Sequence, residues 1–119
     1  MRIVLDTNFL ISANKFKIDL TSELKGNDLY VTGPVVEELE GIAGKNSKDG
    51  VAARLSLKMI KESNLKILES KEREADKSLL ECGKKGFAVA TQDKILKDKL
   101  KRAGTKIIFI RQKKYVVFE

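Results

Sequence analysis

The sequence contains no histidine, a single cysteine and no tryptophan among its 119 residues. Histidine is the side chain that most often transfers protons near neutral pH, so its absence excludes histidine-based RNA cleavage and any Ser-His-Asp or Cys-His hydrolase. A zinc site of the usual nitrogen and sulfur ligands is excluded as well. Any hydrolytic chemistry in this chain must therefore depend on carboxylates, lysines or a metal ion.

Long apolar segments are also missing. No run of roughly 18 apolar residues occurs, and the start at Met1–Asp6 lacks the apolar centre of a signal peptide. We therefore expect a cytoplasmic protein that does not associate with membranes. Cys82 has no partner for an internal disulfide and is expected to be a small core residue. With 42% hydrophobic residues, the chain can form one core, and we expect a single domain over residues 1–119.

The positive charge lies at one end of the chain. Residues 1–93 carry 15 basic and 15 acidic residues, whereas residues 94–119 carry nine basic and two acidic ones, so the whole net charge of +7 lies there. A solvated surface would explain this charge, but a phosphate backbone is the commonest partner of such a segment, and RNA is the expected partner. The basic residues predicted to bind RNA are Lys94, Lys97, Lys101, Arg102, Arg111, Lys113 and Lys114.

Short β-branched runs alternate with helical patterns along the chain. Strands are predicted at residues 3–5, 29–32, 65–68, 87–91 and 107–110, with a weaker candidate at residues 115–118. Helices are predicted near residues 9–14, 20–25, 34–43, 51–63, 72–84 and 94–103. This β-α-β-α order predicts a mostly parallel sheet with helices on both faces.

Two aspartates follow predicted strands. Asp6 comes directly after the first strand, and Asp93 comes just after the strand at 87–91. Because ligands bind at the carboxyl ends of strands in an open α/β sheet, the two carboxylates would face each other if these strands are neighbours. Each aspartate could equally be a helix N-cap, a common role for this residue. Both interpretations stay open from the sequence alone.

Two further carboxylates are selected by helical geometry, at about 100° per residue. Asp76 falls between Leu79 and Leu80, inside the apolar face of its helix, where an unpaired charge is costly. Glu38 lies at the border of the apolar stripe of the helix at 34–43, closer to it than Glu37. The angular margin between Glu38 and Glu37 is small, although Glu38 is favoured.

Four carboxylates in one crevice would repel one another unless cations neutralised them. Hard oxygen ligands select Mg²⁺ or Mn²⁺ over zinc or copper, and such ions suit the hydrolysis of a phosphodiester. A phosphotransferase with Asp6 as its nucleophile is a weaker alternative, because enzymes of the haloacid-dehalogenase type need a second aspartate where this chain has Asn8.

The ordered set of short motifs resembles the PIN-domain nucleases over almost the whole chain. The matching segments are Leu-Asp-Thr-Asn at 5–8, Glu-Leu-Glu at 38–40, Ala-Asp at 75–76 and Val-Ala-Thr-Gln-Asp at 89–93. The resemblance is strongest to the branch that contains the eukaryotic ribosomal-RNA-processing endonuclease and archaeal VapC-like ribonucleases. It implies a three-layer α/β/α sandwich with a five-stranded, mostly parallel sheet.

The resemblance also implies roles for individual residues. Asp6, Glu38, Asp76 and Asp93 match the catalytic acidic set; Asp6, Asp76 and Asp93 would bind Mg²⁺ or Mn²⁺; and the supporting polar residues would be Thr7, Asn8 and Thr91. Relatives often have another aspartate two residues after the position of Asp93, where this chain has Ile95, which puts a full two-metal mechanism in doubt.

The implied activity is a metal-dependent endoribonuclease, acting either in ribosomal RNA processing or as a toxin. Its partners would be RNA, an antitoxin or a ribosome-assembly factor, and a second copy in a homodimer. The alternative from a different class is a PIN fold with a degraded site that binds RNA or protein as a scaffold. Ile95 keeps that alternative open.

Overall fold

Six strands form one sheet in the order β3-β2-β1-β4-β5-β6 in the computed structural model, which describes residues 1–119. The strands are β1 (Arg2–Leu5), β2 (Asp28–Thr32), β3 (Lys66–Leu68), β4 (Ala88–Ala90), β5 (Ile107–Arg111) and β6 (Tyr115–Phe118). The helices are α1 (Thr7–Lys15), α2 (Leu20–Glu23), α3 (Gly33–Ala43), α4 (Lys48–Glu62), α5 (Ala75–Lys84) and α6 (Lys94–Arg102).

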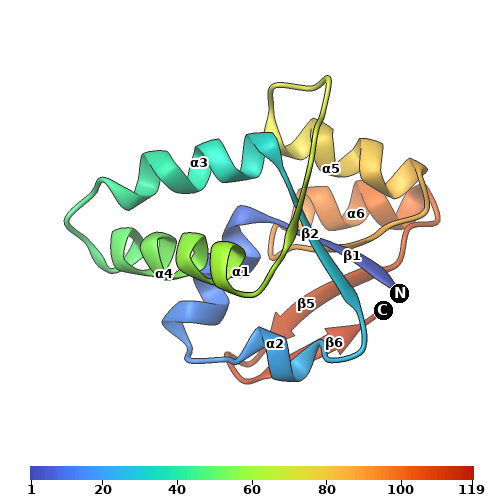
Figure 1. Cartoon of the computed structure of the whole chain (residues 1–119). Helices are drawn as coiled ribbons and strands as arrows, with labels where there is room; N and C mark the ends of the chain where they lie inside the picture. The colour runs from blue at the N-terminus through green and yellow to red at the C-terminus, as the bar shows by residue number, and fades with distance from the viewer.

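The helices cover the sheet on both faces, which confirms the predicted three-layer α/β/α class. Figure 1 shows α1, α3 and α4 grouped on one side and α5 with α6 on the other. The central strand β1 is buried on both faces: Ile3 and Leu5 pack into the core with α1 to α4, whereas Val4 packs with α5 and α6. Such a strand shows a continuous apolar run rather than alternation.

The prediction of a five-stranded sheet is wrong by one strand. β6 pairs antiparallel with β5, and Tyr115 lies opposite Arg111. The other pairs, β3 with β2, β2 with β1, β1 with β4 and β4 with β5, are all parallel. The weak candidate at residues 115–118 is therefore a real edge strand, and "mostly parallel" remains the correct description.

Two predicted helix starts are shifted. α4 begins at Lys48, three residues earlier than predicted, because the Ser47 side chain caps it by accepting a hydrogen bond from the Gly50 amide at 3.1 Å. α5 begins at Ala75, three residues later than predicted, and its N-cap residue Glu74 makes no side-chain capping bond. No helix combines the length and the apolar character needed to cross a membrane.

The strand order places the two aspartate-bearing turns side by side. β1 and β4 are neighbours, with Leu5 level with Ala90. Asp6 therefore leaves β1 at the edge where the Thr91–Asp93 turn leaves β4, and the Asp6 amide donates to the Ala90 carbonyl at 2.8 Å. The carboxyl edge of the sheet is thus the place where the predicted acidic residues can meet.

Candidate active site

Asp6 is a buried carboxylate at the end of β1, with 3% of the residue exposed. Its Oδ1 accepts a hydrogen bond from the Thr7 amide at 2.7 Å, so it does cap α1. Its Oδ2 accepts a hydrogen bond at 2.6 Å from the hydroxyl of Thr91, which follows the neighbouring strand β4. Asp6 therefore fills the capping role and is at the same time tied to the second aspartate-bearing turn.

Thr91 organises that turn. Its Oγ1 accepts a hydrogen bond from the Asp93 amide at 3.1 Å while its hydroxyl hydrogen points to Asp6. Asn8 Oδ1 accepts the Gln92 amide at 2.9 Å and lies 3.2 Å from the Thr91 hydroxyl. Asp93 caps α6 by accepting the Leu96 amide at 3.0 Å. These bonds hold Asp6 and Asp93 in one network of polar side chains and backbone amides.

Glu38 and Asp76 lie together at a separate part of the same region. Both side chains line an open hollow of about 520 Å³ between the start of α3 and the start of α5, and Glu37 also lines it. The sequence interpretation of Asp76 as a core-facing residue is wrong, because Asp76 is exposed. It lies in the first turn of α5, next to the buried Ala75, and its side chain lines the open hollow rather than the core.

The four carboxylates nevertheless influence one another. Burial raises the pKa of Asp6 to about 6; hydrogen bonds from Thr91 and Thr7 lower it, and the charges of Asp76 and Glu38 raise it further. Partial enclosure raises the pKa of Asp76 even though the residue is exposed, and the charges of Asp93 and Glu38 add to that shift. The electrostatic coupling therefore links all four predicted acids.

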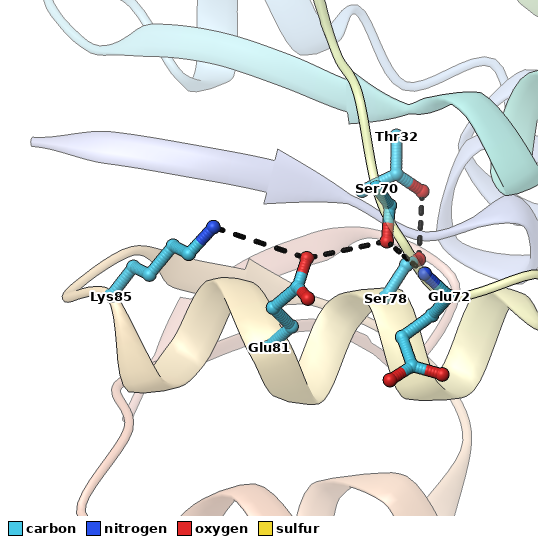
Figure 2. A network of polar contacts seen from close by, with 6 residues as sticks. All are labelled: Thr32, Ser70, Glu72, Ser78, Glu81 and Lys85. Atoms are coloured by element: carbon cyan, nitrogen blue, oxygen red, sulfur yellow. Dashed lines mark hydrogen bonds and ion pairs between the residues drawn. The ribbon is translucent and has the colours of Figure 1, made fainter.

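Buried hydroxyls that the sequence analysis missed hold α5 in place. Thr32 ends β2 and lies 2.8 Å from Ser78, two residues after Asp76 (Figure 2). Ser78 donates its hydrogen to the Ala75 carbonyl at 2.6 Å, so Thr32 must donate to Ser78. Because Thr32 also accepts the Val35 amide at 3.4 Å as the cap of α3, one hydroxyl positions the helices that carry Glu38 and Asp76.

The loop before α5 is tied to the same helix. Figure 2 shows Ser70 donating to Glu81 Oε1 at 3.3 Å and accepting the Glu72 amide at 3.1 Å. Lys85 lies 4.0 Å from the same Glu81 oxygen. Loop residues 69–74 form one wall of the hollow and of a second hollow beside it. The only signal in the sequence for contacts such as that between Thr32 and Ser78 is a hydroxyl residue at the end of a strand or on the apolar face of a short helix.

The side chains as they lie do not form a ready-made metal shell. No group of three or more His, Cys, Asp or Glu residues is close enough to hold an ion. The donor chemistry still fits a hard cation, because the cluster consists of carboxylates, and the negative charges of its members raise the pKa of Asp6 and Asp76. The buried Thr7 hydroxyl also has no hydrogen-bond partner in the protein, and water or a hydrated ion could supply one.

The predicted basic residues lie on two elements, and not all of them are near the carboxylates. Lys94 and Lys97 are in the first turns of α6, and Arg111, Lys113 and Lys114 are at the β5–β6 turn. Lys101 is paired with Glu119 at 2.6 Å, and Glu119 pairs with Ile107 at the opposite end of β5. Arg102, the last residue of α6, lies toward that end too.

Lys99 was absent from the predicted RNA-binding set, but its positive charge lowers the pKa of Asp76. It is the basic residue whose charge acts on this carboxylate, and it comes from α6, which packs beside α5. Ile95, one turn earlier on the same helix, is 70% exposed. The position at which the family resemblance implied a further acid therefore faces solvent in this chain.

The comparison with protein families gives a direct answer. Residues 3–113 match the family described as a PIN like domain. The chain belongs to the PIN-domain nuclease family. This membership confirms the resemblance predicted from the motifs, and it removes the phosphotransferase alternative, which needed a different acidic pair.

Two archaeal PIN-domain relatives are similar over nearly their full length. Ribonuclease VapC4 of Methanocaldococcus jannaschii is 35% identical over 124 residues, covering 96% of this chain and 93% of the relative. Ribonuclease VapC9 of Archaeoglobus fulgidus is 33% identical over 121 residues, covering 98% of this chain and 87% of the relative.

Solved structures support the same fold. The PIN domain endonuclease Utp24 superposes with a TM-score of 0.83 at 23% identity, over 99% of this chain and 90% of that one. A domain of a functionally unknown protein from Methanocaldococcus jannaschii superposes with a TM-score of 0.69 at 21% identity, over 92% and 91%. At these identities the likeness establishes the fold alone.

Proposed function

We propose that this PIN-domain chain is an endoribonuclease that hydrolyses RNA phosphodiesters with Mg²⁺ or Mn²⁺ held by Asp6, Asp76 and Asp93, with Glu38 completing the acidic set. The observation that carries the proposal is the gathering of four acids at one edge of the sheet: Asp6 and Asp93 share the Thr91 network, Glu38 and Asp76 line one hollow, and charges within this set raise the pKa of Asp6 and Asp76. A group of like charges is costly to maintain without a counter-charge, and a divalent cation supplies one. The relatives named ribonucleases support RNA as the substrate.

The four carboxylates would have different roles in such a site, because two are held in place and two are exposed. The Thr91 hydroxyl and the Thr7 amide fix the orientation of Asp6, and the capping bond from Leu96 fixes Asp93. The exposed Glu38 and Asp76 keep rotamer freedom, so they can turn toward a ligand or accept a proton from water. When bound, a divalent cation lowers the pKa of a water molecule and offsets charge on the leaving oxygen.

The decisive experiment compares the wild-type chain with Asp6→Asn in cleavage of single-stranded RNA with Mg²⁺ or Mn²⁺. We expect Asp6→Asn to lose at least about 100-fold in cleavage rate, as when one charge-stabilising group is removed from an active site. RNA affinity should change little, because the basic residues are untouched. Asp19→Asn is the matched control, since Asp19 also caps a helix but is fully exposed and outside the cluster.

Two results would count against the proposal. One is a wild-type chain that cleaves no single-stranded or structured RNA with either ion. The other is cleavage that Asp6→Asn retains in full. RNA binding without cleavage would favour the scaffold alternative. Growth arrest on expression of the chain alone, relieved by an antitoxin, would identify a toxin role, whereas a defect in ribosomal RNA maturation on deletion would identify a processing role.

A further inference from the structure

The β5–β6 hairpin projects past the carboxyl edge of the sheet, where the four carboxylates lie. Leu5, Ala90 and Ile108 are level with one another across β1, β4 and β5. β5 then continues for three more residues, to Arg111, before the chain turns back into β6. The turn of this hairpin therefore lies on the carboxyl side of the sheet, as the candidate active site does, with β5 two and β6 three strand positions from β1.

A side chain joins the hairpin to the catalytic turn. Gln92, between Thr91 and Asp93, uses both ends of its amide on one residue of β5. Its Nε2 donates to the Ile110 carbonyl at 3.1 Å, and its Oε1 accepts the Ile110 amide at 2.6 Å. These two bonds resemble the paired backbone hydrogen bonds between neighbouring strands. They hold the hairpin at a fixed position relative to the Thr91–Asp93 turn.

One face of the hairpin combines aromatic rings with positive charge. Phe109 and Arg111 share a face of β5, because side chains two residues apart point the same way. Lys97 Nζ lies 4.3 Å from the centre of the Phe109 ring, and Arg111 Cζ lies 5.5 Å from it. Tyr115 is directly opposite Arg111 on β6, on the same face, and is 56% exposed.

The turn between β5 and β6 has an uncommon backbone conformation. Gln112 and Lys113 both have positive φ, at 53° and 57°, a conformation that favours glycine or asparagine. Gln112 and Lys113 are neither glycine nor asparagine, so this backbone conformation costs free energy. It places two long polar side chains at the tip of the hairpin. Lys113 and Lys114 add positive charge at the turn, where they line a hollow with residues 16–19, 22 and 23, and Lys113 Nζ lies 5.7 Å from the centre of the Phe16 ring.

The chemistry of this surface matches unpaired RNA. Proteins that bind single strands stack bases on exposed aromatic rings and hold the flanking phosphates with Arg and Lys. A duplex hides its base faces, so a stacking surface selects unpaired segments. The edge strand β6 itself carries no charged residue, so pairing with another copy is the competing use of this edge, and the oligomeric state is an outcome of the test below.

We propose that Tyr115, with Arg111 opposite it on β5 and Lys97 over the Phe109 ring on the same face, is a stacking platform for an unpaired nucleobase of the RNA substrate. The proposal rests on the proposed ribonuclease function and adds a binding position to it. It makes the β5–β6 hairpin, rather than the far end of α6 with Lys101 and Arg102, the main part of the basic segment that recognises RNA.

The test measures binding of a labelled single-stranded RNA oligonucleotide in EDTA, with Asp6→Asn present in every variant so that no cleavage intervenes. Tyr115→Ala should weaken binding by about 5- to 100-fold, the range for loss of one stacked base, and leave the salt dependence unchanged. Tyr115→Phe should restore the affinity, since it keeps the ring. Arg111→Ala should weaken binding and reduce the salt slope by about 0.7.

The chain offers a matched control on the same strand. Phe118 is 48% exposed but lies on the opposite face of β6, paired with Ile108, so Phe118→Ala should leave RNA affinity unchanged. Affinity for a duplex RNA of the same sequence should be insensitive to Tyr115→Ala. Melting temperatures verify that each variant is folded.

Three outcomes overturn the platform. They are equal binding by Tyr115→Ala and its parent, an equal loss with Phe118→Ala, and a change of oligomeric state on size exclusion without a change in RNA affinity, which would make the surface an interface between copies. Cleavage by the wild-type chain is measured separately. An active enzyme with unaffected Tyr115→Ala binding therefore refutes the platform alone, and an inactive chain with the expected binding refutes only the ribonuclease.

Discussion

Asp6 and Asp93 are fixed by hydrogen bonds from Thr91, backbone amides and the first turns of two helices, whereas Glu38 and Asp76 are exposed at the rim of a hollow. Neither Glu38 nor Asp76 belongs to any ion pair of the structure. One half of the acidic cluster is therefore preorganised, and the other half is adaptable. A site of this kind can keep its charges apart when empty of cations and close around a cation when one binds.

The largest expected effect concerns the stability of the buried half. Burial raises the pKa of Asp6 from an ordinary 3.8 to about 6 in the folded chain. Between these values the folded state keeps a proton that the unfolded state has lost, so the free energy of unfolding falls as pH rises from about 4 to 6. Below this window there is no penalty, and above it the full penalty remains.

Asp6→Asn removes this titration. Without divalent ions, the variant should therefore be as stable as wild type near pH 4 and more stable at pH 7, by of the order of 2–3 kcal/mol from a shift of about two pKa units. Urea unfolding at several pH values measures the difference. Equal stability of the two proteins at pH 7 would show that burial does not destabilise the charged form of Asp6.

Thr91 is the residue on which the preorganised half depends. Thr91→Val keeps the shape but removes the hydroxyl that donates to Asp6 and accepts from the Asp93 amide. Leaving these buried groups unpaired should cost about 1–3 kcal/mol of stability. Cleavage should fall by about tenfold or more as Asp6 loses its orientation, roughly 1.4 kcal/mol in the barrier.

Thr91→Ser is the control, since it retains the hydroxyl and should restore most of the activity. Chemical denaturation and steady-state cleavage measure the two effects. Full activity in Thr91→Val would contradict the distinction between a preorganised and an adaptable half, because cleavage would then not depend on a fixed orientation of Asp6.

The fold class could be predicted from the sequence because β and helical patterns alternate clearly. The pairing of β1 with β4 was only a condition of the sequence argument, and the structure supplies it. The sixth strand was harder to predict. Its turn uses Gln112 and Lys113 at positive φ instead of the glycine or asparagine that mark a hairpin. Only the tertiary pairing with β5 shows that Tyr115–Phe118 completes the sheet.

The acidic residues were predictable to different degrees. Asp6 and Asp93 follow from the rule that strand ends face a common edge. Asp76 was selected for a reason that the structure contradicts: an angular position describes rotation about a helix axis but not whether another element covers that position, and Asp76 lines an open hollow. The Thr32–Ser78 bond, across 46 residues, has no local signal in the sequence.

The smallest expected effect tests the adaptable half. Glu38 and Glu37 are neighbours that both line the hollow, but only the charge of Glu38 raises the pKa of Asp6 and Asp76. Mn²⁺ should raise the melting temperature of the wild-type chain, because only the folded state assembles the site. Glu38→Gln should reduce Mn²⁺ affinity by about tenfold, roughly 1.4 kcal/mol, and shrink that shift.

Glu37→Gln removes the same charge from the adjacent residue and should leave the Mn²⁺ shift intact, which separates a specific ligand from the general negative field of the hollow. Thermal melts at several Mn²⁺ concentrations give both affinities. If Glu37→Gln has the larger effect, α3 must present Glu37 to the cation instead, and Glu38 would be the solvated residue of the pair. If neither variant changes the shift, neither glutamate is a ligand and the cation is held by Asp6, Asp93 and Asp76, and Glu37 and Glu38 would then interact with RNA or water rather than with metal.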